Sequence, residues 1–220
     1  MNDADFERAR FNMVEQQIRP WEVLDQRVLD TLMEVPRHRF VDEEYLKVAY
    51  SDIAIPLPHG EEMMHPKIEA KLLQAVNVRP NEKALEVGTG SGYLTALLSR
   101  LAFQVVSVEL HEDLSRKAAE RLAAVGADNV ELRVGDGAEG WPDEAPFDVI
   151  VLTGSVARIP QSLLDQLKPG GRLFAVVGEE PVMEAKLVTR VGDREWAEES
   201  LFETVLPPLR HLEPERRFAF

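Results

Sequence analysis

Short apolar stretches alternate with amphipathic ones from residue 67 onward, and this alternation constrains the fold more than any other feature. The runs "KALEVG", "QVVSVEL", "VELRVG", "DVIVLTG" and "RLFAVVG" predict strands, and the longer stretches between them carry apolar residues at helical spacing. Strands of this kind separated by helices form a mostly parallel sheet that is covered on both faces. The sequence therefore predicts an α/β fold with a doubly wound, mostly parallel Rossmann-like sheet. The stretch 184–209 predicts two more strands around a Gly-Asp turn, as an antiparallel edge.

The beginning of the chain lacks this alternation and predicts an N-terminal helical extension. Apolar residues between Phe6 and Ile18 lie near one helical face, and Pro20 is expected to end that helix. Asp25 is the expected N-cap of a second helix that ends before Pro36. Residues 50–66 are rich in proline and predict a loop. We expect residues 1–65 to form a helical region with a substrate loop, and residues 66–220 to form a ligand-binding α/β domain, packed as one compact unit.

Composition excludes several classes of function. The formal net charge of −14 argues against nucleic acid as a partner, because phosphate binding needs clustered Lys and Arg. The absence of cysteine removes disulfides, thiolate metal sites and a cysteine nucleophile, and the five histidines show no metal-ligand spacing. No apolar run approaches the roughly 18 residues of a membrane span, and the N-terminus is too charged for a signal peptide. The cytoplasm is the expected compartment, with no membrane partner.

A glycine-rich loop, "LEVGTGSGY", follows the first strand of the alternating region and opens a helix. Ligands of such sheets bind beyond the carboxyl ends of the strands, and glycine lets the backbone approach a ligand closely. The spacing G-x-G-x-G differs from the dinucleotide fingerprint, and the loop lacks the G-K-[ST] of a phosphate-binding loop. It therefore predicts a ligand other than a dinucleotide or a nucleoside triphosphate.

Acidic residues stand at the ends of three successive predicted strands. Glu86 precedes the glycine loop and suits a cationic or polar group, and Glu109 lies where a carboxylate accepts both hydroxyls of a ribose. Asp136 follows the third strand, where an adenine edge would lie. The three acids together favour an adenosine ligand with a positive charge and no phosphates, which describes S-adenosyl-L-methionine.

Several segments together carry a family resemblance over nearly the whole chain: "VPRHRFV", "ALEVGTGSGYLTALL", "VGDGAEGWPDEAPFD", "LKPGGRLFAVVG" and "VLPPL". The chain resembles the protein-L-isoaspartate O-methyltransferases, a family of class I S-adenosylmethionine-dependent methyltransferases. The resemblance implies the class I methyltransferase fold and methyl transfer to the free carboxylate of L-isoaspartyl residues in damaged proteins, a protein-repair reaction. The residues expected to bind the cofactor are Glu86, Gly88, Thr89, Gly90, Ser91, Gly92, Tyr93, Glu109, Leu110, Asp136 and Gly137.

The substrate loop departs from the family pattern. That pattern reads roughly G-Q-T-I-S-x-P, whereas this chain reads "GEEMMHP", with Glu62 at the Thr position and Met64 at the Ser position. Two hydrogen-bond donors are thereby replaced by a carboxylate and a thioether. Two alternatives therefore stay open. One is a methyltransferase of the same fold with a different small-molecule or protein acceptor, and the other is a non-catalytic cofactor-binding protein.

Nearby side chains are candidates for the missing functions. His65, beside the lost Ser position, is the candidate catalytic base for a substrate that must be deprotonated, and His59 flanks the loop on its other side. Thr153 and Ser155 follow the fourth strand and are candidate replacements for the lost hydroxyls. The non-functional alternative is that the histidines are ordinary loop residues and that the hydroxyls cap the next helix. The expected partner is a protein or peptide with an isoaspartyl residue, or else a small-molecule acceptor.

Overall fold

The central sheet of the computed structural model, which describes residues 2–212, has seven strands in the order β5-β4-β3-β6-β7-β8-β9. Strands β5, β4, β3, β6 and β7 run parallel, and β8 and β9 add an antiparallel hairpin to β7. The predicted mostly parallel sheet with an antiparallel edge is confirmed. The strands are β3 Lys83–Val87, β4 Gln104–Glu109, β5 Val130–Val134, β6 Phe147–Val156, β7 Leu167–Glu179, β8 Val182–Gly192 and β9 Glu195–Glu203.

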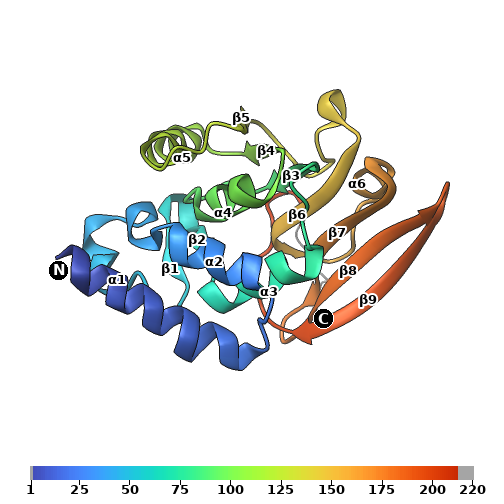
Figure 1. The fold of residues 1–220 in the computed structure, drawn as a ribbon. Helices are drawn as coiled ribbons and strands as arrows, with labels where there is room; N and C mark the ends of the chain where they lie inside the picture. The colour runs from blue at the N-terminus through green and yellow to red at the C-terminus, as the bar shows by residue number, and fades with distance from the viewer. Residues whose placement is uncertain (1, 213–220) are drawn as a thin grey trace, which may run out of the picture.

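An α-helix separates most of the successive parallel strands, as the apolar periodicity predicts, and only a 3-10 turn, Pro142–Glu144, lies between β5 and β6. In Figure 1 the β8–β9 hairpin extends from one side of the molecule, and the N-terminal helix α1 lies on the opposite side. The α-helices are α1 Asp3–Asn12, α2 Gln26–Glu34, α3 Pro66–Val76, α4 Tyr93–Leu101, α5 Glu112–Ala124 and α6 Gln161–Asp165. None of the helices within residues 2–212 is long and apolar enough to cross a bilayer.

Two apolar cores lie on the two faces of the sheet, because successive strand residues point to opposite sides. Ala84 and Val105 belong to the larger core, whereas their neighbours Leu85 and Val106 belong to the smaller one. The larger core also holds apolar side chains of α2, α3, α4 and α5, and the smaller core packs against α6. The N-terminal region and the sheet thus contribute to the same core.

The N-terminal region differs from prediction at its first helix. The α-helical pattern ends at Asn12, continues as a π-helical stretch, Met13–Ile18, and closes with a 3-10 turn, Arg19–Trp21, that contains Pro20. Proline is tolerated there because its missing N–H is not needed at the start of a turn. The predicted Asp25 cap is confirmed, since its side chain accepts a hydrogen bond from the Arg27 amide at 2.9 Å.

The predicted loop before α3 contains a small hairpin of its own. Strand β1, Ile55–Pro56, pairs antiparallel with β2, Glu62–Met63. Between them a short turn, Pro58–Gly60, places His59 at a φ of 64°. This hairpin presents residues 57–64 to the carboxyl ends of β3, β4 and β6, where the pocket described next lies.

Candidate functional site

The glycine loop between β3 and α4 forms the floor of a pocket at the carboxyl ends of the parallel strands. The Gly88 amide donates to the Val108 carbonyl at 2.8 Å, which holds the loop against β4. Gly88 has a φ of +99°, and a Cβ on it would lie 2.1 Å from the Thr153 hydroxyl oxygen. Glycine is therefore required here both by the backbone conformation and by the close approach of Thr153. Gly90 also has a positive φ, +53°.

Glu109, the last residue of β4, links two loops at the edge of the pocket. One carboxylate oxygen accepts the Gly90 amide at 2.8 Å, and the other accepts the His111 amide at 3.0 Å. A carboxylate has about four lone-pair sites, so these two bonds leave acceptor capacity toward the pocket. This geometry supports the prediction that Glu109 can accept a pair of ligand hydroxyls.

Glu86 is a buried carboxyl group on the floor of the same pocket. One oxygen accepts from the Thr95 hydroxyl at 2.5 Å and from the Ser107 hydroxyl at 2.6 Å. The other oxygen, Oε1, is buried and has no hydrogen-bond partner among the described residues. Burial raises the pKa of Glu86 to about 8, although both hydroxyls act to lower it. A cationic ligand group would satisfy Oε1 and favour the ionised form.

Asp136 lines the pocket from the loop after β5, the strand that pairs with β4, whose last residue is Glu109. It accepts from the Ala138 amide at 2.9 Å, and its other oxygen pairs with His211 Nδ1 at 2.7 Å. Partial burial acts to raise the pKa of Asp136, but the Ala138 amide and His211 outweigh it and hold this pKa below its ordinary value. Asp136 is thus an ionised acceptor at the pocket edge.

A segment near the end of the described chain, residues 206–210, also lines the pocket. Ser155 on β6 holds it: the hydroxyl donates to the Leu206 carbonyl at 2.8 Å, and the amide donates to the Pro207 carbonyl at 2.8 Å. The Leu209 amide returns a bond to the Ser155 carbonyl at 2.9 Å. These contacts fix the segment beside the glycine loop.

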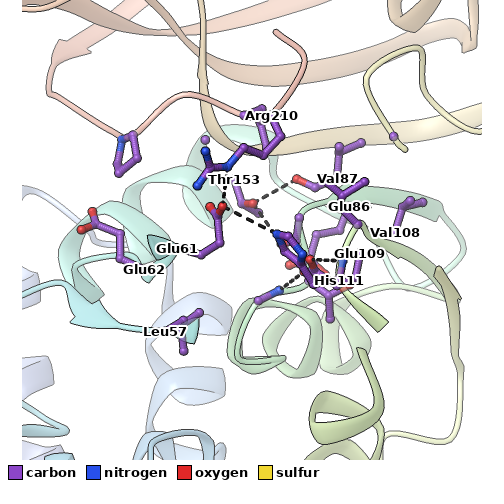
Figure 2. Close-up of a pocket in the computed structure, with 18 of the residues that line it drawn as sticks. Leu57, Glu61, Glu62, Glu86, Val87, Val108, Glu109, His111, Thr153 and Arg210 are labelled. Atoms are coloured by element: carbon purple, nitrogen blue, oxygen red, sulfur yellow. Dashed lines mark hydrogen bonds and ion pairs between the residues drawn. The ribbon is translucent and has the colours of Figure 1, made fainter. Parts of the chain in front are cut away.

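Arg210 joins this segment to the substrate loop at the mouth of the pocket (Figure 2). Its Nε donates to Glu61 at 2.7 Å, and its Nη2 donates to the His59 carbonyl at 3.0 Å. The His59 ring stacks on His111 with centroids 4.0 Å apart, and its Nε2 lies 2.9 Å from Asp113. The mouth is therefore built from three parts of the chain that are distant in sequence.

The two departures in the substrate loop have different surroundings. Glu62 is exposed and Met64 is buried, and both line the pocket. The Met64 carbonyl accepts from Arg37 at 2.6 Å. The loop is thus anchored through its backbone, and neither side chain offers a donor to a ligand.

Arg37 and Glu69 form a fully buried ion pair beneath this loop. The guanidinium of Arg37 also lies 4.8 Å from the centre of the Tyr93 ring, a cation–π contact. Burial raises the pKa of Glu69 to about 7, although Arg37 acts to lower it. The pair connects the N-terminal region, the substrate loop and α4.

The structure brings most of the sequence-predicted site residues together, and five of them lie elsewhere. Tyr93 is buried beneath Arg37, and Gly92 begins α4 with a φ of +84°. The His65 ring faces Asp52, with Nδ1 3.1 Å from the Asp52 carbonyl oxygen. The His59 carbonyl accepts from Arg210 at the mouth of the pocket, and Ser155 lies behind the segment 206–210. The predicted residues that line the pocket are Glu62, Met64, Glu86, Gly88, Thr89, Gly90, Ser91, Glu109, Leu110, Asp136, Gly137 and Thr153.

Sequence reasoning missed the other half of the pocket wall. Glu61, Glu69, His111 and the segment 206–210 all line it. The "VLPPL" motif was the available signal for the last of these, while the others carry no local pattern. No cluster of His, Cys, Asp and Glu that could hold a metal ion occurs within residues 2–212.

Comparison with known proteins identifies one matching family. The family model "Protein-L-isoaspartate(D-aspartate) O-methyltransferase" matches residues 8–213. A protein-L-isoaspartate O-methyltransferase of Methanoculleus marisnigri is 45% identical over 186 residues, covering 84% of each chain. One of Brucella anthropi is 38% identical over 206 residues, covering 93% of this chain and 94% of its own.

Solved structures show the same fold. A protein-L-isoaspartate O-methyltransferase matches with a TM-score of 0.81 and 26% identity, over 91% of this chain and 65% of its own. A β-aspartate methyltransferase structure from Plasmodium falciparum, in complex with S-adenosyl-L-homocysteine, matches with a TM-score of 0.79 and 22% identity, over 93% of this chain and 98% of its own.

Proposed function

The chain belongs to the protein-L-isoaspartate O-methyltransferase family, and from this premise we propose that it methylates the free α-carboxylate of L-isoaspartyl residues in damaged proteins. It is an S-adenosylmethionine-dependent methyltransferase. Family membership favours this reaction over a different acceptor and over a non-catalytic role. The proposed partner is a protein or peptide that carries an isoaspartyl residue, and the cytoplasm stays the expected compartment.

The pocket residues fit S-adenosylmethionine. The bare backbone at Gly88 and Gly90 lets a ligand lie against the loop, and Glu109 has spare acceptor capacity for ribose hydroxyls. We propose that Asp136 faces the adenine edge and that Glu86, with its unpartnered buried oxygen, serves the cationic methionine end. The unpartnered Glu86 oxygen is the observation that carries this assignment, because a buried acceptor without a partner is costly.

Methyl transfer to a carboxylate asks these residues for orientation more than for proton transfer. When bound, S-adenosylmethionine supplies a methyl group activated by a positively charged sulfur. Held by Glu86, Glu109 and Asp136 as proposed above, it would pass this methyl group to a carboxylate oxygen of the substrate, and the electron pair of the broken carbon–sulfur bond would stay on sulfur. The substrate carboxylate is already ionised near neutral pH, so no base is needed. We propose that residues 1–65 cover this site and admit the substrate.

We propose a structural role for His65, since its ring bonds to Asp52 and a base is not required. The His65→Ala variant is expected to keep the wild-type kcat within about twofold, a change of less than about 0.5 kcal/mol in the barrier. A kcat reduced by two orders of magnitude or more would restore His65 as the catalytic base.

The proposed reaction is tested with an L-isoaspartyl peptide and labelled S-adenosylmethionine, beside the same peptide with a normal aspartyl residue. We expect methyl ester formation on the isoaspartyl peptide alone. The Glu109→Ala variant is expected to lose cofactor affinity because it removes the acceptor of two backbone amides and of the proposed ribose hydroxyls. Cofactor binding without isoaspartyl turnover would contradict the proposed substrate and leave the other acceptors open.

A further inference from the structure

The pocket presents an electrostatic problem for an anionic acceptor. Carboxyl groups line it from its floor to its mouth, whereas the proposed substrate group is itself a carboxylate. Like charges held close together repel, and among the buried carboxyl groups that line the pocket only Glu69 has an arginine partner in the described structure, Arg37. The lining carboxyl groups are Glu61, Glu62, Glu69, Glu86, Glu109 and Asp136.

The substrate loop does not supply the compensation. Glu62 and Met64 stand where the family pattern has hydroxyl donors, and neither side chain can donate a hydrogen bond when Glu62 is ionised. The Thr153 hydroxyl is within hydrogen-bond distance of the Val87 and Gly88 carbonyls, at 3.0 and 2.9 Å. Its single proton is thus used within the glycine loop.

Arg210 is the single Lys or Arg among the described residues that line the pocket. Figure 2 shows its guanidinium group at the mouth, beside Glu61 and facing the same cavity as Thr153. The side chain of Arg210 is 47% exposed and that of Glu61 is 26% exposed. An ion pair this exposed exchanges partners at little cost, because water screens both of its charges.

We propose that Arg210 binds the α-carboxylate of the isoaspartyl acceptor, in place of the hydroxyls that the substrate loop lacks. Glu61 and the His59 carbonyl hold the guanidinium group at the mouth until the substrate carboxylate takes the place of Glu61. The planar guanidinium fork matches a carboxylate better than a single hydroxyl does. Methylation turns the acceptor into a neutral ester, so Arg210 returns to Glu61 and the product is released. This inference rests on the proposed function.

The experiment measures charge preference instead of turnover alone. The enzyme is loaded with S-adenosylhomocysteine and titrated with an isoaspartyl peptide, and separately with the same peptide carrying a neutral α-carboxamide. The wild type is expected to prefer the carboxylate by about tenfold or more, since hydrogen bonds to charged groups are the stronger ones. In Arg210→Gln the preference is expected to fall toward one while carboxamide binding stays unchanged. Arg210→Lys is expected to keep part of it, as a point charge without the fork.

Arg19→Gln is the matched control. Arg19 forms a similar half-exposed pair with Glu15 at 2.8 Å and does not line the pocket. It is expected to leave the preference at the wild-type value. An unchanged preference in Arg210→Gln would overturn the inference, whatever the turnover.

Turnover of the isoaspartyl peptide by the wild type is measured in parallel and reports on the proposed function separately. Turnover with a preference that does not depend on Arg210 contradicts the inference alone. Absent turnover contradicts the proposed function, and a preference that is lost in Arg210→Gln then still assigns an anion site to Arg210.

Discussion

Glu86 and Glu69 are buried carboxyl groups whose pKa values stand well above those of exposed glutamates, at about 8 and about 7. Burial is the main cause for both, because it disfavours the charged form. The partners of the two groups differ: Glu86 accepts hydrogen bonds from two hydroxyl groups, whereas Glu69 pairs with an arginine. The local chemistry of each residue therefore determines how it responds to pH and to substitution.

Glu86 makes the stability of the ligand-free protein depend on pH. Its ordinary pKa of 4.5 applies to the unfolded chain, so between pH 4.5 and about 8 the folded chain binds more protons there. The free energy of unfolding must then fall as pH rises through this window. We expect Glu86→Gln to remove this part of the fall, as measured by urea unfolding from pH 5 to 8. Glu69 titrates in both proteins, so equal slopes for the two would contradict the assignment.

Gly88 is expected to tolerate no side chain. Gly88→Ala places a Cβ 2.1 Å from the Thr153 oxygen at a φ of +99°, so either Thr153 or the glycine loop must shift, and both line the pocket. We expect S-adenosylhomocysteine affinity, measured by calorimetry, to fall by about tenfold or more. Gly170→Ala is the control: its φ is +77°, but nothing lies within 4 Å of the added Cβ. That variant should lose only about 1–2 kcal/mol of unfolding free energy, from backbone strain, and should bind S-adenosylhomocysteine as the wild type does.

At the scale of elements, local pattern predicts most of what the structure contains. Helix α4, Tyr93–Leu101, follows the glycine loop as predicted, and the β8–β9 hairpin is antiparallel as expected. The pocket wall formed by residues 206–210 is not predictable this way, because Ser155 bonds Leu206 across a separation of 51 residues. A hydrogen bond between distant segments leaves no period in the sequence. The sequence therefore predicts Ser155 as a substrate contact, whereas in the structure its hydroxyl donates to the Leu206 carbonyl of this wall.

Ser155→Ala is expected to loosen the pocket wall. The variant leaves the buried Leu206 carbonyl without its hydroxyl donor, which should cost about 1–3 kcal/mol of unfolding free energy. S-adenosylhomocysteine should also bind more weakly, since the released segment lines the pocket. Ser200→Ala serves as the control, because the Ser200 hydroxyl bonds Glu184 at 3.3 Å on the exposed hairpin. Equal effects of the two substitutions would contradict this role for Ser155.

At the scale of the whole molecule, the N-terminal region and the sheet are joined by one apolar core and by the buried Arg37–Glu69 pair. The core is the expected outcome of the apolar periodicity in both parts. The ion pair was not predicted, since neither residue carries a local signal of burial. Arg37 holds Glu69, the Met64 carbonyl and the face of Tyr93 at once. The substrate loop therefore takes its position from residues of both regions.

The Arg37–Glu69 pair predicts a marked non-additivity. Arg37→Met should destabilise the protein by about 3–5 kcal/mol, because it strands a buried carboxyl group. Adding Glu69→Leu removes the stranded group and should recover a large part of that loss, as measured by urea unfolding of the two single variants and the double variant. Additive losses would show that the pair does not act as a unit.

The residues that line the pocket are spread along the sequence from residue 57 to residue 210, and this spread has a consequence for synthesis of the protein. A ribosome delivers the chain from the N-terminus at about 5–20 residues per second, and folding begins during delivery. The glycine loop and its acids emerge well before the segment that Ser155 holds in place. A nascent chain that stops before Leu206 thus contains the residues of the pocket floor but lacks the wall formed by residues 206–210. Cofactor affinity should therefore arise only after residues 206–210 have left the ribosome.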